Sequence, residues 1–142
     1  MKSSLGRVGV VLIGFIIFGY AEVWGADWKV YAELKDDIGA FYYDANSITH
    51  PSKNLVKVLT KTLFSKNAVT KRVKEFGNIY KNLSHTVFLR EVDCEEKKDR
   101  VLELTSYTKD GKVLASTKFK EAKWMTINPS SVAEALCEAV CK

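Results

Sequence analysis

The sequence predicts an α+β domain built on a single antiparallel sheet of about six strands, with an amphipathic helix inserted between two β-rich blocks. A second helix ends the chain and is expected to be tied to the sheet by a disulfide. Three observations lead to this prediction. Apolar and polar residues alternate over most of the chain, the spacing becomes helical after residue 65, and cysteines occur both at a strand end and in the terminal helix.

The N-terminal segment has the three-part plan of a secretory signal peptide. A basic start precedes an unbroken apolar run of 14 residues (8–21), and small residues follow it. The run is shorter than the roughly 20 residues that a membrane-spanning helix needs, so we expect no permanent membrane span after cleavage. Cleavage is predicted after Gly25, with Ala21 and Ala26 as the alternative positions.

The predicted signal peptide is residues 1–25, and residues 26–142 have the length of one compact domain. Export would place this domain in the periplasm, on the outer surface or in the medium, where paired cysteines are oxidised. We therefore interpret the three cysteines, Cys94, Cys137 and Cys141, as one bridge and one spare thiol.

The strands are predicted from period-two alternation between turn residues. His50-Pro51-Ser52 is expected to interrupt the chain, and residues 83–94 carry apolar side chains on both faces, as in a strand covered on both sides. Lys109-Asp110-Gly111 joins the two strands of a hairpin. The predicted strands cover residues 27–34, 40–44, 53–64, 83–94 and the two halves of the hairpin 100–119.

Helical spacing appears in the middle of the chain. Apolar residues recur at intervals of four, three, four and three, at Val69, Val73, Phe76, Tyr80 and Leu83. This spacing places them on one helix face and predicts an amphipathic helix over about residues 68–80, with Gly77 as a weak point inside it.

The terminal helix is predicted within residues 128–142. Asn128 can cap it, Pro129 suits its first turn, and Ser131 with Glu134 fits a capping box. At 100° per residue the helix has an apolar stripe that suits packing on a sheet. This stripe contains Val132, Ala135, Leu136, Ala139 and Val140.

Two cysteines lie on one flank of that stripe, so either Cys137 or Cys141 can reach the sheet. Cys94, at the end of a strand, is the remaining thiol. We predict a Cys94–Cys141 bridge, which would contribute roughly 4 kcal/mol through loop closure, with Cys94–Cys137 as the alternative.

One set of segments is spread over most of the chain: WKVY, YYDANSI, EVDC at 91–94, Arg100, the KDG hairpin, Trp124, Ile127, Pro129, Ser130 and the closing VCK. This set resembles the surface-adhesin protein E-like family of exported bacterial proteins. The resemblance implies an antiparallel sheet with a C-terminal helix tied to it by a disulfide, and it implies surface exposure and a tendency to dimerise. In a pathogen's member it implies binding of host laminin and vitronectin. Cys137 is an extra cysteine relative to the usual pair of the family.

Positive charge is concentrated between residues 53 and 81, where eight basic residues stand against one acidic residue, Glu75. A basic strand followed by a basic helix suits polyanions such as sulfated glycans, lipid head groups or acidic protein patches. The candidate binding residues are Lys53, Lys57, Lys61, Lys66, Lys71, Arg72, Lys74 and Lys81.

The sequence contains no H-E-x-x-H, G-x-S-x-G or Walker pattern and only two histidines, so we predict no enzyme activity, no cofactor and no metal site. Nucleic acid is an unsuitable partner for an exported domain. The predicted function is a non-enzymatic surface or envelope binding module for extracellular matrix proteins, envelope proteins or anionic glycans. The alternative is a structural or assembly component of the periplasm or cell envelope without an adhesive role.

Overall fold

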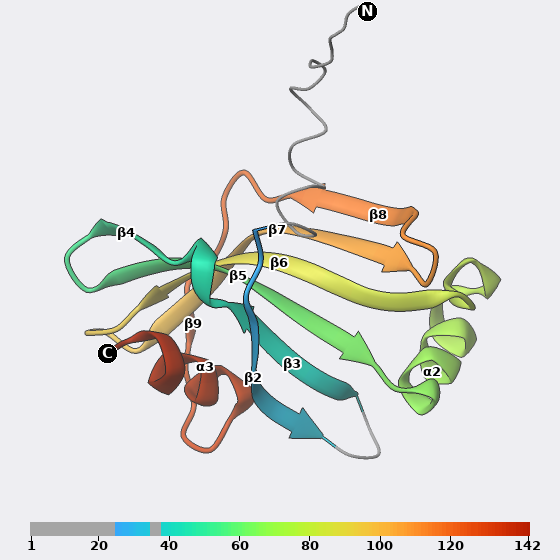
Figure 1. Cartoon of the computed structure of the whole chain (residues 1–142), viewed down its shortest axis with the longest axis horizontal. Coiled ribbons are helices and arrows are strands. Elements are labelled where there is room, and N and C mark those ends of the chain that lie inside the picture. The colour runs from blue at the N-terminus through green and yellow to red at the C-terminus, as the bar shows by residue number, and fades with distance from the viewer. Residues whose placement is uncertain (1–24, 35–37) are drawn as a thin grey trace, which may run out of the picture.

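The computed structural model describes residues 25–34 and 38–142 (Figure 1). The signal peptide predicted for residues 1–25 therefore lies, apart from Gly25, outside the described residues. Residues 35–37 also lie outside them.

One antiparallel sheet forms the body of the molecule, and its main path runs β2-β3-β5-β6-β7-β8 (Figure 1). The short strands β4 and β9 pair with β5 and β7 beside this path. The strands are β2 (Trp28–Leu34), β3 (Gly39–Asp44), β4 (Thr49–Ser52), β5 (Leu55–Phe64), β6 (Leu83–Asp93), β7 (Lys98–Thr108), β8 (Val113–Lys118) and β9 (Met125–Thr126).

The main path matches the six predicted strands, but the described sheet has eight, so the predicted count was wrong. Strand β4 contains His50-Pro51-Ser52, which was expected to interrupt the chain. All four residues of β4 are exposed and it pairs only with β5, a position where a proline is tolerated. Strand β9 has two residues, too few to show an alternating pattern.

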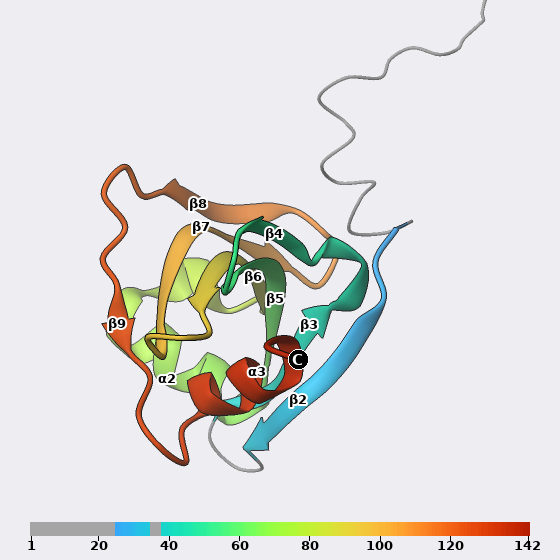
Figure 2. The same ribbon diagram turned by 90° about the vertical axis from the view of Figure 1, so that its left-hand side faces the viewer.

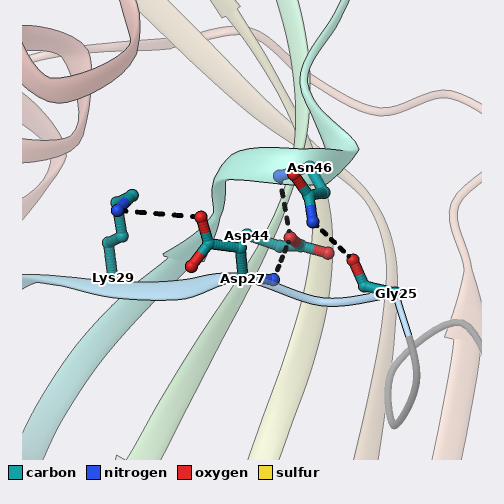
Figure 3. Close-up of polar contacts among 5 residues, drawn as sticks. All are labelled: Gly25, Asp27, Lys29, Asp44 and Asn46. Carbon is teal, nitrogen blue, oxygen red and sulfur yellow. Dashed lines mark hydrogen bonds and ion pairs between the residues drawn. The ribbon is translucent and has the colours of Figure 1, made fainter.

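The corner between β3 and β4 is held to the start of β2 by Asp44, which is 4% exposed (Figure 3). Its Oδ1 accepts hydrogen bonds from the backbone N–H groups of Asp27 at 2.8 Å and Asn46 at 2.9 Å. The Asn46 side chain donates to the carbonyl of Gly25 at 2.8 Å. The 3-10 turn η2 (Ala45–Ser47) is thereby fixed beside the first strand.

Helix α2 (Lys66–Phe76) begins two residues before the predicted helix and ends four residues earlier. Ser65 caps it by accepting a hydrogen bond from the Ala68 N–H at 3.1 Å. Gly77 has a φ of 103°, which ends the helix, and a 3-10 turn η3 (Asn78–Tyr80) follows. The prediction of one helix over 68–80 was therefore wrong about Gly77, which ends α2.

Helix α3 (Val132–Val140) lies against the inner face of the curved sheet (Figure 2). The predicted capping box is present in modified form. Ser131 Oγ accepts from the Glu134 N–H at 3.1 Å, and the Glu134 carboxylate accepts from the Ser130 N–H at 2.8 Å. Asn128 does not cap the helix, because α3 begins at Val132 and Ser131 is its N-cap; the Asn128 carbonyl accepts a hydrogen bond from Ser131 Oγ at 2.6 Å.

The hydrophobic core lies between α3 and the sheet. Apolar residues of β5 and β6 pack against the apolar stripe of the helix, as the helical spacing predicted. The buried members of this core are Val56, Val58, Val92, Ile127, Leu136, Cys137 and Val140. Residues on both faces of β6 are buried, Val87 and Glu91 on one face and Thr86 and Val92 on the other, as the sequence pattern of residues 83–94 indicated, although α3 covers only the second of these faces (Figure 2).

The structure contains the predicted Cys94–Cys141 disulfide, with a Cα–Cα distance of 5.7 Å. Helix α3 ends at Val140, so Cys141 lies just beyond it and can turn toward the end of β6. Cys137 is a buried free thiol whose Sγ lies 3.6 Å from Cys141 Sγ. The spare thiol thus fills space in the core beside the bridge.

Candidate ligand-binding surfaces

The eight basic residues singled out from the sequence occupy three places. Lys53 lies in the turn between β4 and β5, Lys57 and Lys61 lie on β5, and the others lie on or just after α2. The β4–β5 turn and α2 are at opposite ends of the sheet (Figure 1). Lys53 is therefore separated from the basic residues of α2 by the length of β5.

Lys57 and Lys61 point to the sheet face opposite α3, because the residues that alternate with them on β5 form the core. The ammonium group of Lys61 lies 4.4 Å from the ring centroid of Trp28 and 5.6 Å from that of Tyr42. These cation–π contacts hold it against the protein. Lys57 makes no cation–π contact with any residue of 25–34 or 38–142 and lines a groove described below.

The basic residues of α2 point in several directions. Arg72 lies over the rings of Phe64 and Phe76, at 5.4 and 5.8 Å, and lines a shallow hollow together with Lys71 and Glu75. Lys74 is exposed in the last turn of the helix, where a cation suits the helix dipole. Lys66 is also exposed and is the first residue of α2.

Lys66 and Lys81 line one pocket, of about 500 Å³, together with Lys109. We call it the lysine pocket. Its apolar wall comes from β5, α2 and the start of β6, and its hydroxyl groups are those of Thr70 and Ser84. The lining residues are Leu63, Phe64, Lys66, Val69, Thr70, Lys81, Leu83, Ser84 and Lys109.

The turn between β7 and β8 brings Lys109 to this pocket. The backbone N–H of Lys109 donates to the Asn82 carbonyl at 3.2 Å, which fixes the turn beside Lys81. Lys109 was not among the predicted binding residues, since it is distant in sequence from residues 53–81. Only the pairing of β6 with β7, which places Leu83 opposite Thr108, brings it there.

The lysine pocket is strongly positive. It has three ammonium groups and no carboxylate among its lining residues, and within residues 25–34 and 38–142 none of the three lysines has an ion-pair partner. Asp110 follows Lys109 in sequence, but its carboxylate accepts a hydrogen bond from Thr108, which lowers its pKa, and it lies 3.9 Å from Lys112.

The hydroxyl groups of the pocket have partners within the protein. Thr70 donates to the carbonyl of Lys66 at 3.0 Å, and Ser84 Oγ lies 3.0 Å from Nδ1 of His85. The His85 ring stacks on Tyr107 at 5.0 Å. The ammonium groups are therefore the main polar groups that the pocket offers to a ligand.

A second hollow, of about 530 Å³, lies on the sheet face opposite α3. We call it the open-face groove. Leu59, Val87 and Leu89 form its floor, and Ser47 and Thr49 form the wall near β4. The other lining residues are Lys57, Glu103, Thr105 and Lys118, of which Lys118 comes from β8.

The inner face holds a buried polar cluster of Arg90, Asp99 and Tyr31. Arg90 Nη1 lies 3.6 Å from the Asp99 carboxylate, and its Nε donates to Thr60 at 2.9 Å. Burial raises the pKa of Asp99, and the arginine opposes this rise. Burial likewise raises the pKa of the Tyr31 hydroxyl. Since Arg90 and Asp99 pair with each other and Arg90 also bonds Thr60, we assign this cluster a role in stability.

The part of the chain that the structure describes contains no cluster of three or more His, Cys, Asp or Glu residues able to hold a metal ion. Its helices are also too short or too polar for any of them to cross a membrane.

A protein-family model described as "Surface-adhesin protein E" matches residues 28–142. Among solved structures, crystal form II of Haemophilus influenzae protein E is similar to the chain, with a TM-score of 0.53 and 12% sequence identity. The similarity covers 71% of this chain and 79% of that one, and at this identity it supports the fold alone. A search of curated protein sequences found no significant match.

Proposed function

Because the chain belongs to the surface-adhesin protein E family, we propose that it is an exported, non-enzymatic binding module of the bacterial surface or envelope. Its ligands in this proposal are extracellular matrix proteins, envelope proteins or anionic glycans. The family match supports the adhesin-like role. The chemistry of the lysine pocket supports an anionic ligand.

The observation that carries the anionic ligand is the convergence of Lys66, Lys81 and Lys109 on one pocket that contains no carboxylate. Like charges gathered on a low-dielectric wall raise the local potential and attract anions. Sulfate and carboxylate groups of a glycan, or an acidic protein segment, would replace the missing counter-charges. The apolar wall of Leu63, Phe64 and Val69 would lie against the remainder of the ligand.

Heparin-affinity chromatography of the mature domain tests this proposal. The triple variant Lys66→Gln, Lys81→Gln, Lys109→Gln should elute at lower salt and bind a heparin oligosaccharide about tenfold more weakly, because three contacts of a few tenths to one kcal/mol are lost. The matched control replaces Lys98, Lys120 and Lys123 by Gln, which removes the same net charge outside the pocket. Equal elution of both variants would reject the lysine pocket as the binding site.

Location distinguishes the binding module from its alternative, a structural or assembly component of the periplasm. We propose that residues 1–25 are a signal peptide, so N-terminal sequencing of the protein from its own cells should begin at Ala26. Protease treatment of intact cells should then degrade the domain at the surface. A purely periplasmic protein that resists this treatment would favour the assembly role.

The proposal includes self-association, which the family resemblance suggests. Light scattering coupled to size-exclusion chromatography would measure the mass of the mature domain directly. A mass that remains at one chain up to high micromolar concentration would remove dimerisation from the proposal.

A further inference from the structure

The open-face groove has the composition of a site for an amphiphile. Its floor consists of three aliphatic side chains from adjacent strands, with Leu59 directly opposite Leu89 in the register of β5 and β6. Val87 is 5% exposed, and its neighbours Leu59 and Leu89 are half-buried. The volume of about 530 Å³ falls within the range of roughly 300 to 1,000 Å³ that is usual for small-molecule sites.

Two lysines line this floor. Lys57 comes from β5 and Lys118 from β8, and within the described residues neither makes an ion pair. The cross-strand neighbour of Lys57 is Glu91, whose carboxylate is engaged by Arg100 at 2.7 Å. The carboxylate of Glu103, opposite Lys118, is the acidic group that the lining contains.

We propose that the open-face groove binds a free alkyl carboxylate, that is, a fatty-acid-like ligand. The aliphatic floor takes the alkyl chain, since burial of apolar surface drives association without a directional requirement. The ammonium group of Lys57 or Lys118 pairs with the carboxylate. The groove lining contains no aromatic side chain, so a flexible alkyl chain suits it better than a ring that needs stacking.

This site is distinct from the lysine pocket, with which it shares no lining residue. It also differs in chemistry, because it combines two lysines and one glutamate with an aliphatic floor. The ligand therefore needs both parts, a chain and an acid group. A short anion without a chain, such as acetate, should bind at least tenfold more weakly than dodecanoate.

The test titrates the mature domain with dodecanoate and with dodecyltrimethylammonium, both below their critical micelle concentrations, by calorimetry. Saturable one-to-one binding of dodecanoate is expected, with binding of the cationic amphiphile at least fivefold weaker. Two variants change the charge at the groove in opposite directions. Lys57→Gln with Lys118→Gln should weaken dodecanoate binding about fivefold to tenfold, and Glu103→Gln should strengthen it about twofold or more.

The matched control replaces Lys98 and Lys123 by Gln, which removes the same charge outside the groove and should leave the affinity unchanged. Thermal unfolding of each variant checks that the fold is retained. The proposal is overturned if dodecanoate does not saturate, if both amphiphiles bind equally, or if the groove and control variants behave alike. The proposal is also overturned if the mature domain binds neutral phosphatidylcholine vesicles that lack fatty acid as tightly as it binds dodecanoate. That result would assign this face to a membrane surface.

Discussion

Removal of the Cys94–Cys141 disulfide is expected to lower the free energy of unfolding by about 4 kcal/mol. The bridge joins residues 47 apart in sequence, and loop-closure entropy for a ring of that size gives about this value. A small domain has a net stability of only about 5–15 kcal/mol, so the loss would be large.

The free thiol of Cys137 complicates a simple single substitution, because its Sγ lies 3.6 Å from Cys141 Sγ and can exchange with the bridge. The comparison should therefore start from Cys137→Ala, which keeps the bridge, and add Cys94→Ala with Cys141→Ala. Urea unfolding followed by tryptophan fluorescence gives both stabilities. Dithiothreitol should reduce the stability of the first variant by a similar amount. A difference below about 1 kcal/mol between the two variants would refute the entropic reasoning.

Three further predictions concern single residues. Asp44→Ala removes the acceptor of two backbone N–H groups and should lower the urea-unfolding free energy by about 1–3 kcal/mol; an unchanged midpoint would contradict this. Gly39→Ala places a Cβ 2.0 Å from a backbone oxygen of β5 at a φ of 132°, and should lower the melting temperature far more than Gly111→Ala, whose Cβ meets nothing within 4 Å. Burial in the folded state raises the pKa of Asp99, so the folded protein binds a proton at the Asp99 carboxylate more tightly than the unfolded chain does. Wild type should therefore gain stability relative to Asp99→Asn as the pH falls from 7 through 4, and a constant difference in unfolding free energy would contradict this.

Much of the sheet could be predicted from the sequence because alternation is a local signal. On β5 the core residues Val56 and Val58 alternate with Lys57 and Leu59, and this order fixes which face is buried. The terminal helix could be predicted equally well, since its apolar stripe and its Ser131 cap are local features of the sequence. The short strands were not, because two to four exposed residues carry too few side chains to show a period.

The candidate sites could be predicted only in part, because some of their residues are distant in sequence and meet through strand pairing. Lys66 and Lys81 are part of a basic segment that is obvious in the sequence, whereas Lys109 joins them only through the β6–β7 pairing and the hydrogen bond to Asn82. The same limitation applies to the open-face groove. Lys118 reaches it because β8 pairs with β7 and places this lysine opposite Glu103.

Both candidate sites nevertheless lie along the same side of one strand. The residues of β5 that point away from α3 run from Lys57 in the groove to Leu63 in the lysine pocket. Six residues of extended chain span about 20 Å, which exceeds the Debye length of about 8 Å at physiological ionic strength. The two sites should therefore bind independently when the ligands are short.

Independence can be tested by exchanging the variants between the two assays. The groove variant with Lys57 and Lys118 replaced should bind a short sulfated oligosaccharide as the wild type does. The pocket variant with Lys66, Lys81 and Lys109 replaced should bind dodecanoate as the wild type does. If each variant weakens both ligands equally, net charge alone would govern binding, and the geometry of the two sites would have no part in it. Separate losses would instead show that the disulfide-tied helix leaves one face of the sheet free to carry two binding sites of different chemistry.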